Sequence, residues 1–263
     1  GFETVTMVRN GFCDHSDSLG ATARFGGGDV QWVTAGRGIV HSEMFPLLRQ
    51  DADNPLELFQ IWLNLPSADK MVDPHFSMQW REQVPVCVVR DEAGRRTTLT
   101  IVAGSYGDTR ALPPPPRSFA AKDESDVAIW TLALEAGARF TLPRARRVAE
   151  RTVYLFRGAG AQVAGARVPA RIGLRLRGDV DVAIEAGPEP CEILLLQGAP
   201  IGEPVVQHGP FVMNSPAEIE AAFADYRRTR FGGWPFEQDD PVHGTEQRRF
   251  ARHPDGRLDE PPT

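Results

Sequence analysis

The sequence predicts an all-β protein folded as two barrel-like or sandwich-like domains. Its 25 glycines and 22 prolines divide the 263 residues into short segments. These segments are rich in β-branched and aromatic residues and lack the long periodic stripes of helices. About ten strands at this spacing are typical of barrels and sandwiches. A chain of this length suits one large domain or two of about 130 residues each, and we expect two.

Ten segments have the composition of short strands. Turn-forming residues separate them, and glycine-containing turns join several neighbours, as at Ala93–Gly94 and Gly178–Asp179. The expected strands are Glu3–Val8, Asp29–Thr34, Leu58–Leu63, Val86–Arg90, Thr97–Ala103, Val127–Leu134, Thr152–Phe156, Gly173–Arg177, Val180–Ile184 and Glu192–Gln197.

A run of four prolines, Pro113–Pro116, marks the expected boundary between the two domains. Proline has no backbone N–H to donate to a β ladder and favours an extended polyproline conformation. A proline-rich loop inside a single domain is the alternative. We therefore expect an N-terminal domain at residues 1–112, a linker at 113–122, a C-terminal domain with a terminal helix at 123–232, and a polar, largely disordered tail at 233–263.

One helix is clearly signalled near the end of the C-terminal domain. Ser215 suits the N-cap, Pro216 the first helical position, and Glu218 the third position of a capping box. Apolar residues then recur at helical spacing until a pair of glycines ends the pattern. The apolar positions are Ile219, Ala222, Phe223 and Tyr226, and the glycines are Gly232 and Gly233. We expect this helix to pack against its domain.

Composition excludes several classes of protein. The net charge of −6 and the pI near 5.6 offer no basic surface to nucleic acid, and no apolar run approaches the roughly 20 residues of a membrane helix. Cys13, Cys87 and Cys191 are far apart and odd in number, which argues against a disulfide framework or a zinc knuckle. The first residues lack the features of a secretory signal. We therefore expect a cytoplasmic protein that binds neither DNA nor membranes.

The segment Thr34–Glu43 contains the sharpest local feature of the sequence. Two glycines form a tight turn, after which His41 and Glu43 are two residues apart. On a strand this spacing places an imidazole and a carboxylate on the same face. Such a mixed pair suits Fe(II), Mn(II), Ni(II) or Zn(II), and two histidines with one carboxylate are typical of non-haem iron oxygenases. The alternative is a polar strand face with a hydrogen-bonded pair.

Five segments resemble the motifs of the pirin family and occur in the family's order. They extend from residue 1 to about residue 230, nearly the whole chain. The segments are Gly1–Thr6, Gly28–Trp32, Thr34–Glu43, Trp62–Pro66 with Lys70–Val72, and Gln207–Asn214. The resemblance implies two cupin β-barrels, also described as double-stranded β-helices or jelly rolls, with a C-terminal helix.

The resemblance also implies a metal centre in the N-terminal cupin. Members of the family hold a single iron there through three histidines and a glutamate, and His41 and Glu43 match the last two of these ligands. We therefore expect one Fe(II) per chain, with other divalent transition metals as alternatives, and we expect Glu43 to act also as a catalytic base. The other two histidines of the family belong to a His-Pro-His-Arg segment that would precede Gly1, so the first strands of this cupin are expected to be missing.

Other polar residues are expected to be structural. His15 is expected to lie in a turn and to bond the local backbone instead of a metal. Glu3 occupies a place where many other cupins, but not pirins, have a ligand. His75 is expected in an exposed loop and His208 in a packing or hydrogen-bonding role. Residues 76–207 contain no histidine, so we expect no metal in the second barrel.

The resemblance implies a function as well. Pirins are similar to quercetin 2,3-dioxygenases, which implies an oxidoreductase that opens a flavonol ring with O₂. Its partner would be a small aromatic substrate held against the apolar lining of the barrel. The alternative is a non-catalytic, iron-binding regulatory protein that docks a protein partner, as the eukaryotic members of the family suggest. A monomer is expected in either case.

Overall fold

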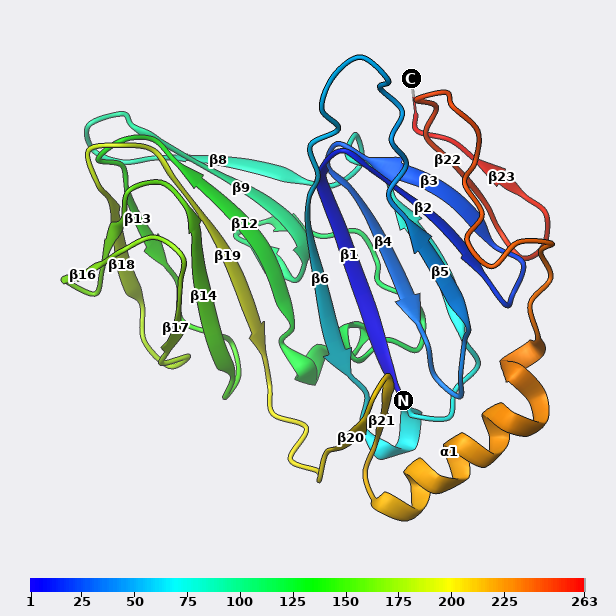
Figure 1. The fold of residues 1–263 in the computed structure, drawn as a ribbon. Coiled ribbons are helices and arrows are strands. Elements are labelled where there is room, and N and C mark those ends of the chain that lie inside the picture. Colours follow the sequence, from blue (N-terminus) through cyan, green and yellow to red (C-terminus); the bar gives the residue numbers. More distant parts are fainter. Residues whose placement is uncertain (263) are drawn as a thin grey trace. The chain divides into compact units, whose positions relative to one another are not determined.

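Antiparallel strands form nearly all of the regular structure in residues 1–262, which the computed structural model describes (Figure 1). The chain divides into two units. Unit 1 contains residues 1–83, 115–119 and those from 202 onward, and unit 2 contains residues 84–114 and 120–201. The expected all-β class with one C-terminal helix is confirmed. In the described residues, no helix has the length and apolar composition that crossing a membrane would require.

Unit 1 is built around two antiparallel sheets. The first sheet has the strand order β6-β1-β4-β7, and the second has the order β23-β22-β3-β2-β5. In chain order the strands are β1 (Phe2–Asn10), β2 (Phe12–Asp17), β3 (Thr22–Gly26), β4 (Asp29–Thr34), β5 (His41–Met44), β6 (Glu57–Asn64), β7 (His75–Gln79), β22 (Phe250–Arg252) and β23 (Leu258–Asp259). Unit 1 also contains the hairpin of β20 (Val206–His208) and β21 (Phe211–Met213), the helix α1 (Pro216–Thr229), and short 3-10 helices at Ser67–Asp69 and Arg230–Gly232.

The two sheets of unit 1 enclose a shared core. Its buried apolar members come from both sheets and are Val8, Cys13, Ala21, Ala23, Phe25, Val33, Phe76, Trp80 and Ala251. Because side chains alternate along a strand, Thr4 and Thr6 lie on the same face of β1 as Val8. Thr6 lies directly opposite Gln31 of β4, so these two side chains share that face. The interior of unit 1 is therefore partly polar.

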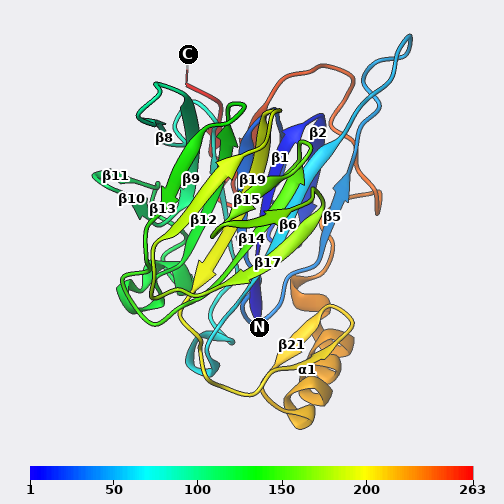
Figure 2. The same cartoon turned by 90° about the vertical axis from the view of Figure 1, so that its left-hand side faces the viewer.

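Unit 2 is a second two-sheet barrel, with an apolar core. Its larger sheet has the order β17-β14-β19-β12-β9-β8, and its smaller sheet has the order β13-β18-β15-β16. Figure 2 shows β12, β19 and β14 running side by side. The strands are β8 (Val86–Arg90), β9 (Arg96–Ala103), β10 (Ser105–Tyr106), β11 (Thr109–Arg110), β12 (Ala128–Leu134), β13 (Arg139–Leu142), β14 (Glu150–Arg157), β15 (Ala161–Val163), β16 (Ala166–Val168), β17 (Ile172–Leu176), β18 (Val182–Ala186) and β19 (Cys191–Gly198), and a 3-10 helix lies at Asp123–Ser125. A further 3-10 helix, Phe119–Ala121, begins with the last residue of the 115–119 segment of unit 1 and continues into unit 2. Buried residues of both sheets, among them Leu99 and Phe140, form one cluster.

The helix α1 begins as its sequence predicts. Ser215 is the N-cap, and its side chain accepts a hydrogen bond from the backbone N–H of Glu218. The Glu218 carboxylate accepts a hydrogen bond from the N–H of Asn214 at 2.9 Å. Caps of this kind contribute about 1 kcal/mol. Phe223 of the helix contacts Phe211 of β21, with ring centres 4.5 Å apart, which ties the helix to the hairpin (Figure 2).

The division of the chain differs from the boundary expected at residues 113–122. The strands β8 and β9 belong to unit 2, and not to the expected domain 1–112, because β9 pairs with β12 beyond the proline run. The helix α1 belongs to unit 1, and not to the expected domain 123–232. Local sequence reveals a proline-rich connection, but strand pairing across that connection depends on register between distant segments.

The disorder expected for residues 233–263 is wrong for the described part of that segment. The strand β22 extends the second sheet of unit 1 by pairing with β3. On β23, Asp259 accepts a hydrogen bond from the indole N–H of Trp80 at 3.1 Å. Arg249 pairs with the fully buried Asp29 at 2.7 Å. The polar residues of this segment, whose abundance suggested disorder, thus provide partners for buried polar groups of unit 1.

Removing residues 241–263 should therefore destabilise unit 1. The deletion exposes the backbone groups along β3 and leaves the Asp29 carboxylate without Arg249. We expect the melting temperature to fall by about 6 °C or more and aggregation to increase. A matched deletion of residues 261–263 leaves these contacts in place. Thermal unfolding with light scattering measures both effects, and equal melting temperatures for the two deletions would contradict the structural role of the tail.

Candidate metal centre

Two neighbouring strands of unit 1, β2 and β5, position the candidate site. Their antiparallel register places His15 opposite Glu43 and Asp17 opposite His41. His41 and Glu43 are two residues apart on β5, so their side chains lie on one face of that strand. One donor atom from each of His15, His41 and Glu43 lies within 4.8 Å of the other two.

The turn before β5 requires its glycines. Gly36 and Gly38 have φ angles of 49° and 141°, a region that disfavours residues with a Cβ atom. A Cβ atom on Gly36 would also lie 2.1 Å from the Val72 carbonyl oxygen, to which the N–H of Arg37 donates at 2.9 Å. The turn is thus held against Val72, and it directs the chain toward His41.

His15 lies on β2 and is fully buried, so its expected location in a turn is wrong. Its Nε2 atom is 2.9 Å from Oδ2 of Asp17. The other oxygen of Asp17 accepts hydrogen bonds from the backbone N–H groups of Leu19 and Ala21. The buried Nδ1 atom of His15 has no hydrogen-bond partner within residues 1–262. Metal-ligating histidines have this arrangement, in which a carboxylate holds one ring nitrogen and the other faces the metal.

Glu43 is held by donors from the first sheet. Its Oε2 atom accepts a hydrogen bond of 2.7 Å from the side-chain amide of Gln60 on β6. Its Oε1 atom has a longer contact, 3.5 Å, with the hydroxyl of Thr6 on β1. The indole N–H of Trp62 donates to the amide oxygen of Gln60 at 3.4 Å, which orients that amide. The carboxylate is therefore fixed through Oε2, and Oε1 keeps lone pairs available.

His41 forms the exposed side of the cluster. Although one side of the residue is open, desolvation by the surrounding protein lowers the pKa of His41, and the nearby His15 lowers it further. Glu43 and Asp17 act in the opposite direction. The lowered pKa favours neutral imidazole at neutral pH, which is the form that coordinates metals. His41 also lines a large cavity of unit 1.

A buried amide faces the same interior as Glu43. Gln31 on β4 is 1% exposed, and neither polar atom of its side chain has a hydrogen-bond partner in the part of the chain that the structure describes. It lies directly opposite Thr6, whose hydroxyl contacts Glu43. A buried amide without a partner is costly, so this interior suits a ligand with polar atoms. Nothing in the local sequence distinguishes Gln31 from an ordinary strand residue.

The residues present fit a divalent transition-metal ion. They offer two imidazoles and one carboxylate, and metal–ligand bonds of about 2.0 to 2.2 Å suit a group of this size. Among residues 1–262, no other group of three His, Cys, Asp or Glu residues has donor atoms this close together. His15 and Asp17 have the same two-residue spacing as His41 and Glu43. That spacing is the sequence signal that could have identified His15.

The other polar residues singled out in the sequence lie away from the cluster. Glu3 is buried on the opposite face of β1, where its carboxylate accepts hydrogen bonds from the hydroxyls of Thr34 and Ser118 at 2.6 and 2.7 Å. Burial raises the pKa of Glu3, and these hydrogen bonds oppose the rise. His75 is exposed, as expected, but begins β7 instead of lying in a loop. His208 packs its ring against α1, in the expected role.

Comparisons with known proteins agree with this architecture. The family described as Pirin matches residues 1–63, and the Pirin C-terminal cupin domain matches residues 129–232. A Pseudomonas aeruginosa protein provisionally named quercetin 2,3-dioxygenase is 36% identical, over 88% of this chain and 76% of its own length. Human Pirin is 31% identical, over 88% of this chain and 75% of its own length.

A solved structure has the same fold. The crystal structure of a quercetin 2,3-dioxygenase from Acinetobacter baumannii matches with a TM-score of 0.76 and 32% sequence identity. The match covers 89% of this chain and 77% of that chain. The two-barrel architecture of the present chain is therefore shared with a protein whose sequence is clearly related.

Replacing Gln31 by Leu should raise the melting temperature by about 2 to 4 °C, because the substitution removes a desolvated amide without a partner. Gln79 provides a matched control. It is 4% exposed, its amide also has no partner within residues 1–262, and it lies on the opposite face of the same sheet. Gln79→Leu should give a similar rise. Thermal denaturation measures both changes, and a lower melting temperature for Gln31→Leu alone would show that its amide is paired.

Proposed function

The chain belongs to the pirin family, and we propose that it is a mononuclear non-haem iron dioxygenase that opens a flavonol ring of the quercetin type with O₂. The single observation that supports this proposal best is the convergence of His15, His41 and Glu43 from strands β2 and β5 of unit 1. Two histidines and one carboxylate with open positions are typical of non-haem iron oxygenases. The names of two relatives point to the same reaction.

In this proposal His15, His41 and Glu43 hold one Fe(II). When bound, the iron supplies Lewis acidity toward a flavonol oxygen and redox chemistry with O₂. Asp17 keeps the His15 ring oriented through Nε2. Phe76 stacks on His15, with ring centres 5.3 Å apart, and shields this side of the site from water.

Glu43 is the proposed base. Its Oε1 atom has only the 3.5 Å contact with Thr6, so it can accept the proton of a flavonol hydroxyl, while Gln60 holds Oε2 at 2.7 Å. The proton then resides on Oε1. The amide of Gln31 offers a donor and an acceptor to the oxygen atoms of the substrate, because neither is used by the described residues.

A regulatory role is the second candidate, and an exposed apolar loop favours it. Phe45 and Leu47, which follow β5, are 47% and 70% exposed, and Leu56, which precedes β6, is 41% exposed. Exposed apolar side chains on a loop next to the candidate centre offer a contact to a protein partner. In this role the chain would bind iron without turning over a substrate.

Turnover distinguishes the two candidates. The protein is loaded with Fe(II), and the loss of quercetin absorbance is followed together with O₂ uptake. The dioxygenase proposal expects the two to proceed in equimolar amounts. Full iron occupancy without turnover would reject the dioxygenase proposal and favour the regulatory role.

His15→Ala and His41→Ala should each reduce the retention of Fe(II) or Zn(II), because each substitution removes a nitrogen ligand. His75→Ala is the matched control, since His75 is an exposed histidine on the far face of the first sheet. It should retain metal like the parent protein. Metal analysis after dialysis measures the effect. If His15→Ala retains as much metal as the control while His41→Ala loses it, His15 is not a ligand.

Glu43→Gln should lower turnover more than it lowers metal occupancy. The amide keeps one oxygen ligand but lacks both the negative charge and the proton-accepting oxygen. Loss of a general base costs about 100-fold or more in rate. Turnover is measured per bound iron, with occupancy determined on the same sample. An unchanged turnover number per iron would exclude Glu43 as the base.

Gln31→Leu should lower turnover even though it stabilises the fold, because the proposed function uses the amide to position the substrate. Gln79→Leu, with its side chain on the other face of the sheet, should stabilise the fold without affecting turnover. Steady-state kinetics of the two variants measures the difference. Equal activities would show that Gln31 plays no part in substrate positioning.

A further inference from the structure

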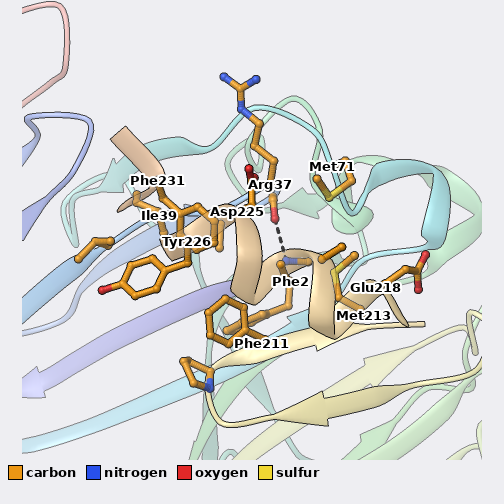
Figure 3. A pocket seen from close by; sticks show the side chains of 18 of the residues that line it. Phe2, Arg37, Ile39, Met71, Phe211, Met213, Glu218, Asp225, Tyr226 and Phe231 are labelled. Carbon is orange, nitrogen blue, oxygen red and sulfur yellow. Dashed lines mark hydrogen bonds between the residues drawn. The ribbon is translucent and has the colours of Figure 1, made fainter. Parts of the chain in front are cut away.

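The second sheet of unit 1 has buried polar side chains on both of its faces. Because side chains alternate along β2, His15 and Asp17 point to the inner face. That face bears the candidate centre, and His41 at the edge of the sheet also lines the cavity drawn in Figure 3. Asp14 and Ser16 point to the outer face, and both are fully buried. Another segment of the chain must therefore cover the outer face.

The C-terminal segment provides this cover. Residues 241–249, which we call the strap, lead into β22, and β22 pairs with β3 of the same sheet (Figure 1). Arg24 of β3 lies directly opposite Asp14, so it shares the outer face with that carboxylate. The guanidinium of Arg24 donates to the backbone carbonyls of Gly244 and Glu246 in the strap. The strap therefore lies across the back of the sheet that bears the candidate centre.

His243 joins the strap to β2. Its backbone N–H donates to Oδ2 of Asp14 at 2.8 Å. Its ring atom Nε2 lies 2.9 Å from the backbone carbonyl oxygen of His15 and 3.4 Å from the hydroxyl of Ser16. A carbonyl oxygen can only accept a hydrogen bond, so Nε2 carries the hydrogen and donates it to His15. One residue of the strap thus binds three consecutive residues of β2.

An aromatic contact orients the His243 ring. Phe250, the first residue of β22, meets this ring edge to face, with ring centres 5.5 Å apart. Pairs of this geometry are favourable. Phe250 itself lies opposite Arg24 in the ladder between β22 and β3. The N–H of the His243 ring is therefore directed at β2 by a strand of the same sheet.

The bond from His243 acts on the backbone of a candidate ligand. Asp17 holds the His15 ring through Nε2, and the Nδ1 atom has no partner within residues 1–262. The distance from this atom to His41 and Glu43 depends on how β2 sits against β5. A metal site needs its ligands held to within about 0.5 Å. A carbonyl fixed from the outer face restricts movement of β2 relative to β5.

We propose that His243 is a positioning residue for the metal centre, and that its ring N–H fixes the backbone of His15 from the outer face of the sheet. The inference rests on the proposed function, because it takes His15, His41 and Glu43 as the metal ligands. His243 itself does not reach the inner face, where those ligands lie. It also lies beyond residue 232, where the match to the family ends, so the family's motifs do not include it.

The Zn(II) affinity of His243 variants tests the proposal. His243→Phe keeps a ring against Phe250 but removes the ring N–H, and it should weaken Zn(II) binding about tenfold. His243→Gln places an amide N–H at about the reach of Nε2 and should recover most of the loss. His243→Asn is equally polar, but its amide ends short of the His15 carbonyl, so it should bind Zn(II) as weakly as His243→Phe. Competition with a chromophoric chelator measures the affinities.

The absorption spectrum of Co(II)-loaded protein provides a second readout. The visible bands of Co(II) depend on the geometry of its ligands. We expect these bands to shift in His243→Phe and His243→Asn and to return toward those of the parent protein in His243→Gln. A purely structural role of His243 would lower the melting temperature of the variants without changing the bands of the protein that remains folded.

Asp259→Ala is the matched control. Asp259 of β23 accepts the hydrogen bond of the Trp80 indole at the far end of the same sheet. Its substitution loosens the C-terminal segment without removing a contact to β2. It should lower the melting temperature of the metal-free protein and leave both the Zn(II) affinity and the Co(II) spectrum as in the parent. An equal loss of Zn(II) affinity in Asp259→Ala and His243→Phe would overturn the positioning role.

The outcomes separate this inference from the proposed function. Unchanged Zn(II) affinity and an unchanged Co(II) spectrum in His243→Phe would overturn the inference, and quercetin turnover by the iron-loaded parent would still support the dioxygenase. Equal affinities of His243→Gln and His243→Asn would overturn the assignment to the ring N–H. Metal binding that depends on His243, in a protein that never turns quercetin over, would support the inference and reject only the dioxygenase. A parent protein that retains neither Zn(II) nor Co(II) would overturn the metal centre and the inference together.

Discussion

The burial of charged and titratable residues on β2 is the constraint on which the rest of unit 1 depends. Asp14, His15 and Asp17 are all fully buried, and removing such groups from water is costly unless partners replace the water. Arg24 of β3 binds both carboxylate oxygens of Asp14, at 2.7 and 2.6 Å. It also donates to the backbone carbonyl of Gly244 at 2.9 Å. The C-terminal segment therefore supports the strand that bears His15, and the candidate centre depends on residues from both ends of the chain.

Elements whose stabilising features are local could be predicted from the sequence. The capping residues of α1 lie within four positions of one another, and all ten expected strands overlap observed strands because a composition rich in β-branched and aromatic residues is a local property. The strands β2 and β22 could not be found in this way. Asp14 to Asp17 has the composition of a turn, and the cost of burying the Asp14 carboxylate is offset by Arg24 of β3 and by the backbone N–H of His243, far along the chain. Likewise, Phe250 of β22 lies opposite Arg24, a pairing that no local pattern indicates.

In the candidate site, too, only the features set by local sequence could be predicted. The spacing of His41 and Glu43 places both side chains on one face of any strand that contains them. His15 joins them only because β2 pairs with β5 in the register that puts it opposite Glu43. A slip of one residue would turn His15 to the other face. Gln31 is a similar case, since the presence or absence of a partner for its amide is a property of the folded barrel and not of the strand sequence.

The glycine turn couples the candidate centre to the cavity. Gly36 lies against Val72 and Gly38 against Phe231, so contacts on both sides fix the turn before β5 begins at His41. A displacement of the Phe231 ring would therefore alter the path by which the chain enters β5. The left-handed backbone at Phe231, the amide on β4 that has no partner among residues 1–262, and the buried charges on β2 each carry a cost in stability. Proteins retain such features where a site requires them. All three lie in unit 1 around one imidazole and one carboxylate, whereas the core of unit 2 is apolar. This distribution argues that unit 1 is where the chain meets its ligand.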